Sequence, residues 1–182
     1  MRVAAGIDIE TTGLSQEDGH RMVEVGIRLY NFDNGEFIVK FVQRLNPQRP
    51  IDPKAQAVHG ISFEDVADCM TWEEYAPRFV KIMSKVDVLI AHNGESFDLP
   101  FINGELIRVG QPVLFQPLID TMLKARWATP MGKYPNLGEL CFACGVDYDP
   151  SKAHGADYDI DVMCQCYFKY KDYFGDVNVV PR

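Results

Sequence analysis

The sequence predicts an α/β protein built on one five-stranded mixed sheet with helices packed against it. Three strand-like segments follow one another between residues 3 and 45, a pattern typical of an antiparallel meander. Beyond residue 86, short apolar strands alternate with helical segments, which indicates parallel strands. The 182 residues, 47% of them hydrophobic, suffice for one core. We expect a single domain over 1–182, with its folded core over about 3–174 and a tail over 175–182.

The meander occupies the first quarter of the chain. Its strands are expected over 3–9, 22–32 and 36–45, and Asn34-Gly35 between the last two is a strong hairpin signal. A proline-containing loop begins at Pro47. Short helices should follow it, with Ser62 and Thr71 as their N-caps.

The strand-helix alternation occupies the second half of the chain. A strand over 86–91 leads through a glycine-containing turn into a helix over about 96–109. The remaining elements are a fifth strand near 118–120, helices around 121–127 and 136–144, and a final helix over about 155–174. An antiparallel meander that continues as strand-helix alternation fits a ribonuclease H-like fold.

Composition and charge narrow the class of protein. The first strand begins at Val3, which leaves no room for a secretory leader, and no run of 18 apolar residues occurs. We expect a soluble, cytoplasmic protein without a membrane partner, its five cysteines reduced. The net charge of -8 argues against a broad basic face for nucleic acid, so any phosphate contact should be local and assisted by divalent cations.

Two carboxylates end the first strand. Asp8 and Glu10 lie two positions apart, so strand alternation puts both on one face of the sheet, close enough to share a metal ion. A solvated strand end is the alternative for such a pair. The residues that follow, Thr11-Thr12-Gly13-Leu14, favour the metal because glycine lets the backbone approach a ligand and an exposed leucine has no evident structural need.

Two further acids stand where a helix meets the sheet. Asp98 follows the fourth strand and opens the next helix, where it could also serve only the helix dipole. Asp159 lies inside the apolar stripe of the final helix, whereas Asp157 and Asp161 lie on the opposite side as ordinary surface residues. A carboxylate in a buried stripe is costly unless it is paired or binds metal, and no basic residue on that stripe offers itself.

His154 precedes the final helix and lies five residues before Asp159. A lone histidine is usually a surface or packing residue. In a loop beside this acidic group, however, a neutral imidazole is well suited to remove a proton from water near neutral pH.

Together these residues resemble the DnaQ-like exonucleases of the DEDDh type, most closely the proofreading exonuclease subunits of bacterial replicative polymerases. Asp8 and Glu10 match the first family motif, Asp98 the second, and the string from His154 to Asp159 the third. The similarity extends over about 3–167 and includes the stretches 46–61 and 120–141. No tyrosine stands four residues before Asp159, which favours the histidine class.

The resemblance implies a set of roles. Asp8, Glu10, Asp98 and Asp159 would hold two divalent ions, Mg²⁺ or Mn²⁺, with His154 as general base. Hydrolysis would remove nucleotides from a single-stranded or frayed 3' end, of DNA in preference to RNA, and release nucleoside 5'-monophosphates. Residues implied to bind the terminal nucleotide and its phosphate are Thr11, Leu14, Val58, His59, Asn93 and Phe97.

Three alternatives remain open from the sequence. One is an RNA-trimming exonuclease of the same family. Another is an accessory protein that binds a polymerase, although the chain as given stops at Arg182 and shows no counterpart of the family's polymerase-binding C-terminal extension. The third is a zinc-stabilised interaction module with little nuclease activity, held by the cysteine pairs Cys141/Cys144 and Cys164/Cys166.

Overall fold

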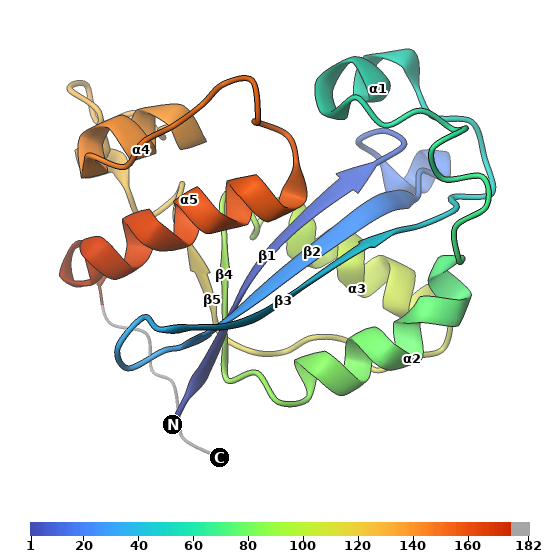
Figure 1. The fold of residues 1–182 in the computed structure, drawn as a ribbon, viewed down its shortest axis with the longest axis horizontal. Helices are drawn as coiled ribbons and strands as arrows, with labels where there is room; N and C mark the ends of the chain where they lie inside the picture. The colour runs from blue at the N-terminus through green and yellow to red at the C-terminus, as the bar shows by residue number, and fades with distance from the viewer. Residues whose placement is uncertain (176–182) are drawn as a thin grey trace.

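The computed structural model describes residues 1–175, so most of the expected tail lies outside the described residues. The sheet has the order β3-β2-β1-β4-β5 (Figure 1). Strands β1 (Val3–Thr11), β2 (Met22–Asn31) and β3 (Phe37–Arg44) pair antiparallel, whereas β4 (Val88–Ala91) and β5 (Leu118–Asp120) continue the sheet in parallel with β1. The predicted five-stranded mixed sheet and its ribonuclease H-like class are confirmed.

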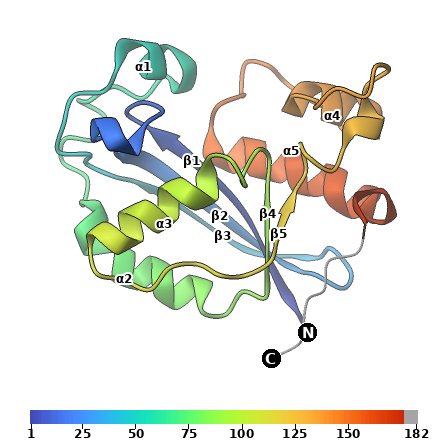
Figure 2. The ribbon, with the colours of Figure 1, turned by 180° about the vertical axis from the view of Figure 1, so that it is seen from behind.

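Helices cover both faces of the sheet. The α-helices are α1 (Pro53–His59), α2 (Trp72–Met83), α3 (Asp98–Arg108), α4 (Leu137–Cys144) and α5 (Ala156–Lys169), and short 3-10 helices span Gln16–Asp18, Arg126–Ala128 and Lys171–Phe174. α2 and α3 pack on one face, and α4 and α5 on the other, as the views from opposite sides show (Figures 1 and 2). Among residues 1–175, no helix is both long and apolar enough to cross a bilayer.

The alternation of β1 divides its side chains between these two layers. Ala5, Ile7 and Ile9 join the core under α2 and α3. The opposite face carries Gly6, where an added Cβ would lie 2.5 Å from the Ile160 side chain of α5. Because α5 approaches β1 so closely there, the next residues on that face lie beside the first turn of α5.

Some expected elements differ in the structure. The region read as a loop contains α1, because the Asp52 side chain accepts the Lys54 N–H and a proline suits the first helical turn. Ser62 opens a turn instead of a helix, since its N–H and hydroxyl both bond the Asp65 carboxylate. Thr71 does cap α2, within a capping box.

The segment 121–127 was expected to be a helix and is instead a turn that leads into a 3-10 helix. Its backbone N–H groups at Met122 and Leu123 bond the Asp120 carboxylate, at 2.9 and 3.0 Å. The final α-helix ends at Lys169, and a 3-10 helix follows it.

Candidate active site

Asp8 and Glu10 lie near the carboxyl end of β1, where α1 rises above the edge of the sheet (Figure 1). Both side chains are half-buried on the face that α5 covers. The antiparallel register sets Asp8 across from Gly26 and Glu10 across from Glu24 of β2. The pair is therefore not a freely solvated strand end.

Asp98 is the first residue of α3 and is only 4% exposed. Its Oδ1 accepts the backbone N–H of Ile9 at 3.2 Å, which holds the carboxylate against β1 between Asp8 and Glu10. Position at the helix start favours an acid, as the helix dipole predicts. The contact to β1 shows that this acid also belongs to the group at the strand end.

Asp159 lies in the first turn of α5, and His154 lies in the loop just before it. The Oδ2 atom of Asp159 accepts the His154 backbone N–H at 2.9 Å, and its Oδ1 is buried with no hydrogen-bond partner among the described residues. His154 is exposed and has φ 62°, a left-handed conformation that is uncommon outside glycine. Such strain occurs most often at functional sites.

Burial raises the pKa of all four acids, and Asp8 and Glu10 are also repelled by other acids of the group. Burial, and then repulsion by Asp98, Glu10 and Asp159, raises the pKa of Asp8 well above its usual range. Burial, followed by repulsion from Asp159, raises the pKa of Glu10 to about 8. Burial likewise raises the pKa of Asp98 to about 7 and lifts the pKa of Asp159. Each of these shifts favours the protonated carboxyl group, and a neighbouring positive charge would oppose it.

A divalent cation fits this donor set. The group offers carboxylate oxygens, the ligands that Mg²⁺ and Mn²⁺ prefer, and it contains the buried Asp159 oxygen that lacks a partner. Within residues 1–175, no group of three His, Cys, Asp or Glu side chains is arranged to bind a metal ion in this conformation. Asp98 and Asp159 each accept a backbone N–H instead, so side chains must turn for the ligands to converge.

Two hollows lie beside the carboxylates and contain most of the predicted site residues. One, of about 510 Å³, is lined by Glu10 together with the predicted nucleotide-binding residues Thr11, Leu14, Val58, His59 and Phe97. The other, of about 570 Å³, is lined by Asp8, Asn93, His154 and Asp159. Asp98 lines neither hollow and is buried.

His59 joins α1 to the end of β1. Its Nδ1 accepts the Ile61 N–H at 3.0 Å, which leaves Nε2 to donate to the Thr11 carbonyl at 3.2 Å. Burial lowers the pKa of His59, so the imidazole is neutral near pH 7. The contact keeps the hollow between α1 and the strand end in shape.

Asp120 organises the loop that carries Asn93, and the sequence reasoning missed it. This fully buried carboxylate at the end of β5 accepts the N–H groups of Asn93 and Glu95 at 3.1 and 3.0 Å, besides the two in its own turn. Asn93 itself is left-handed, with φ 68°. A carboxylate that ends an apolar strand was the available signal, as it was for Asp8.

The cysteines do not form the zinc site considered from the sequence. All five are free of disulfides, as expected. Cys166 lies 3.7 Å from Cys141, sulfur to sulfur, whereas Cys164 lies on another side of α5 against Gly6. Because Cys164 lies away from the group that Cys166 forms with Cys141 and Cys144, the four thiols do not converge, and the Cys₄ alternative is wrong.

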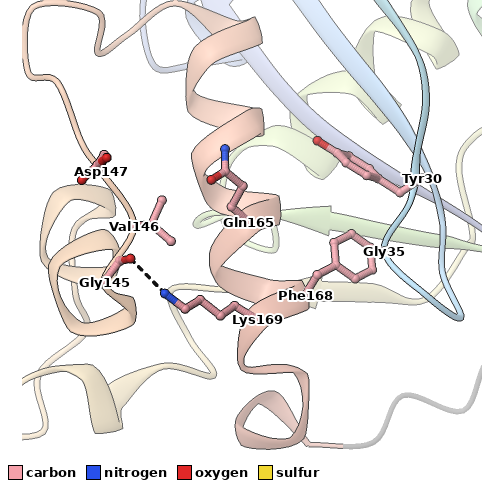
Figure 3. A pocket seen from close by; sticks show the side chains of 8 residues that line it. All are labelled: Tyr30, Gly35, Gly145, Val146, Asp147, Gln165, Phe168 and Lys169. Atoms are coloured by element: carbon pink, nitrogen blue, oxygen red, sulfur yellow. Dashed lines mark hydrogen bonds between the residues drawn. The ribbon is translucent and has the colours of Figure 1, made fainter.

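A separate hollow of about 460 Å³ lies farther along α5, between that helix, the end of α4 and the β2–β3 hairpin (Figure 3). Lys169 reaches across it to donate to the Gly145 carbonyl at 2.9 Å. None of the predicted site residues lines this hollow.

The sheet order and the acidic group at its edge define a ribonuclease H-like protein with a candidate phosphodiester-cleaving centre. The sequence profile of the RNase T family, described as Exonuclease, matches residues 5–167. The chain therefore belongs to this exonuclease family, which confirms the resemblance recognised in the sequence.

Bacterial replication proteins are among its relatives. The chain is 33% identical over 173 residues to the DNA polymerase III subunit epsilon of Haemophilus influenzae, a match over 88% of this chain and 64% of that subunit. The Escherichia coli epsilon subunit is 30% identical, with 88% and 68% covered. A DNA polymerase III PolC-type of Ureaplasma parvum is 34% identical, but the chain spans only 12% of its length.

Solved exonuclease structures share the fold. Exonuclease X in complex with 5' overhanging duplex DNA superposes with a TM-score of 0.67 and 26% identity, over 94% of this chain and 99% of that one. Exonuclease I gives a TM-score of 0.81 at 16% identity, over 96% of this chain and 42% of the other. The second match supports the fold alone.

Proposed function

We propose that the protein is a metal-dependent 3'-5' exonuclease that removes nucleoside 5'-monophosphates from the 3' end of DNA in the cytoplasm. One observation carries the proposal: Asp8 and Glu10 of β1, Asp98 of α3 and Asp159 of α5 gather at one edge of the sheet, where burial raises the pKa of each. Membership of the exonuclease family supports the reaction class.

The four carboxylates would hold two Mg²⁺ or Mn²⁺ ions. Bound there, the ions would lower the pKa of the attacking water and stabilise the charge that develops on the leaving oxygen. The paired positions of Asp8 and Glu10 on one strand face suit ligands that must be held at fixed spacing.

His154 would act as general base. It lines the same hollow as Asp8 and Asp159, and the Asp159 carboxylate bonds its backbone N–H at 2.9 Å. A neutral imidazole there can accept a proton from the attacking water and later release it to solvent. Its exposure gives that proton a direct path out of the protein.

The hollow under α1 would receive the terminal nucleoside. Phe97 and Val58 offer apolar surface for the base, and Thr11 lines the same hollow. Leu14 is 84% exposed at the rim, where it can wedge against the last base and favour frayed or single-stranded ends. Asn93, on the other side of the carboxylates, would lie near the scissile phosphate.

A time course on end-labelled strands tests the proposal. Matched single-stranded DNA and RNA oligonucleotides are incubated with Mn²⁺, with and without EDTA. We expect a ladder that shortens by one nucleotide from the 3' end, faster on DNA, and no reaction in EDTA. Faster shortening of RNA would favour the RNA-trimming alternative, whereas internal cuts or activity in EDTA would overturn the mechanism.

A polymerase partner is a second candidate role, favoured by the epsilon relatives. Such a role would assign the protein a binding partner and would not change the proposed reaction. Co-purification of the protein with a replicative polymerase would support it.

A further inference from the structure

Glu24 of β2 is a buried acid that faces another acid. The sheet register pairs Glu10 with Glu24 and Glu24 with Arg44, so three charged residues form a row across β1, β2 and β3. Side chains directly opposite one another in antiparallel strands lie on the same face, where like charges destabilise the pair. The Glu24 side chain is only 9% exposed, so water does little to screen this repulsion.

The two oxygens of Glu24 have different partners. Oε2 accepts the Arg44 Nε–H at 3.2 Å, which supplies a countercharge. Oε1 accepts the backbone N–H of Ala156, the first residue of α5, at 3.4 Å. N–H groups in a first helical turn have no partner within the helix, and the helix dipole favours an anion there. Glu24 therefore connects the sheet to the start of α5.

The Ala156 N–H that Glu24 accepts lies between two residues of the proposed site. Ala156 stands between His154 and Asp159 in the chain. Gly26 of β2 allows the close approach, since a Cβ at that position would lie 2.9 Å from the Ala156 Cβ. Any movement at Ala156 would shift Asp159 relative to Asp8 and Glu10.

The charge of Glu24 reaches the proposed metal ligands. Its Coulombic repulsion is among the causes that raise the pKa of Asp8 and of Glu10. A negative charge that repels carboxylates attracts a cation held between them. The repulsion within the row is thus relieved when a divalent ion binds.

We propose that Glu24 is a positioning residue for the metal centre. It anchors the first turn of α5, and thereby Asp159, while its charge strengthens the binding of divalent cations by the four carboxylates. The inference rests on the proposed function, because it assigns Glu24 to the same centre.

Three variants of the full chain separate position from charge. Glu24→Ala removes the charge and both acceptor oxygens, whereas Glu24→Gln removes the charge but keeps one oxygen, which can still accept the Ala156 N–H while the Arg44 contact is lost. Glu105→Gln is the matched control, because Glu105 is 1% exposed, pairs with Arg21 and Arg108, and lines neither hollow. Mn²⁺ dissociation constants are measured by paramagnetic resonance of the free ion, alongside thermal unfolding and the kcat and KM for a single-stranded DNA oligonucleotide.

We expect both Glu24 variants to bind Mn²⁺ about tenfold more weakly, at the lower end of the 10–100-fold effect of groups that support metal ligands. Glu24→Ala should lose at least about tenfold in kcat at saturating Mn²⁺ with little change in KM, and Glu24→Gln should recover most of that kcat. Glu105→Gln should bind Mn²⁺ as the wild type does.

The opposite outcomes are distinguishable. Wild-type Mn²⁺ affinity in Glu24→Gln, or an equal loss in Glu105→Gln, would overturn this inference even if the wild type degrades DNA. A wild type that binds Mn²⁺ more tightly than Glu24→Gln but degrades no oligonucleotide would overturn the proposed function and leave the inference standing.

Discussion

His154 and Asp159 are linked by one hydrogen bond yet have separable tasks in the proposed reaction. The bond joins the backbone of one to the carboxylate of the other, so the imidazole remains free to meet solvent. Asp159 keeps a buried oxygen without a protein partner, which suits a ligand of a cation. Substitutions at the two positions should therefore differ in their effect on metal binding.

We expect His154→Ala to lower kcat by about 10²- to 10⁴-fold, the range for loss of a general base, while the Mn²⁺ dissociation constant stays close to that of the wild type. Asp159→Asn should lower kcat and weaken Mn²⁺ binding together. Steady-state kinetics and Mn²⁺ titration provide the two readouts. Wild-type turnover by His154→Ala would refute the base assignment.

Asp120 has a structural role, because its carboxylate accepts four backbone N–H groups near the site. The Asp120→Asn substitution replaces an acceptor by an N–H₂ group that faces backbone donors, so at least one buried N–H loses its partner. We expect the free energy of unfolding to fall by about 2 to 4 kcal/mol in urea denaturation. Asp149→Asn is the control: its carboxylate is 45% exposed, and the change should stay within about 0.5 kcal/mol. Equal losses in the two variants would contradict this role.

At the scale of elements, the position of the site depends on the packing of α5 against the sheet. Arg28 of β2 bonds Asp157 and Asp161 of α5 at 2.8 and 2.9 Å, and Lys40 of β3 also bonds Asp157. Both acids lie at the surface, as expected, but they are also half-buried ion-pair partners of the sheet, which was not expected. The helical periodicity placed Asp157 and Asp161 away from the apolar stripe of α5. It could not show that Arg28 of β2 and Lys40 of β3 would reach that side of the helix.

Glycine at position 6 sets the distance between β1 and α5. In Gly6→Ala, the new methyl group would lie 2.5 Å from Ile160 and 2.6 Å from Cys164, so α5 must move outward. We expect a loss of about 1 to 3 kcal/mol in unfolding free energy, as for overpacked cores, and a lower kcat because Asp159 moves with the helix. Gly155→Ala, whose added Cβ meets nothing closer than 3.5 Å, is the control for stability. If Gly6→Ala unfolds at the same urea concentration as the wild type, the close docking of α5 does not limit stability.

At the scale of the whole molecule, the acidic group makes stability depend on pH and on metal. The pKa of Glu10 rises from 4.5 to about 8 on folding, and that of Asp98 from 3.8 to about 7. Between these limits the folded state binds more protons than the unfolded state, so stability falls as pH rises. The stability that the protonated Glu10 and Asp98 carboxyl groups contribute is complete below about pH 4 and is lost by about pH 8.

We therefore expect the metal-free protein to lose on the order of 2 to 4 kcal/mol of this contribution between pH 5 and pH 8. Mn²⁺ or Mg²⁺ should restore most of it at pH 8, because a bound cation favours the ionised carboxylates. Thermal unfolding in EDTA and in metal, across that pH range, measures both effects. Glu10→Gln should flatten the dependence, and a metal-free protein that is most stable at pH 8 would contradict the explanation.

Local patterns in the sequence were sufficient to predict the strands of the sheet. Residue alternation, the Asn34-Gly35 hairpin and the apolar run before Asp120 act over a few neighbouring residues, so the antiparallel meander and the later strands followed from short segments, whereas the structure placed β4 beside β1. The same patterns singled out the four acids and His154, which the structure gathers at one edge of the sheet. Their catalytic roles stay predictions.

The sequence by itself determined that a meander precedes strand-helix alternation, and that carboxylates end the first strand and open two helices. Only the tertiary structure decided that Glu24 faces Glu10, that Asp120 binds the Asn93 loop and that α5 is tied to β2 and β3. The physical reason is range: alternation and capping depend on neighbours in the chain, whereas these charge contacts join segments far apart and exist only once the backbone is packed.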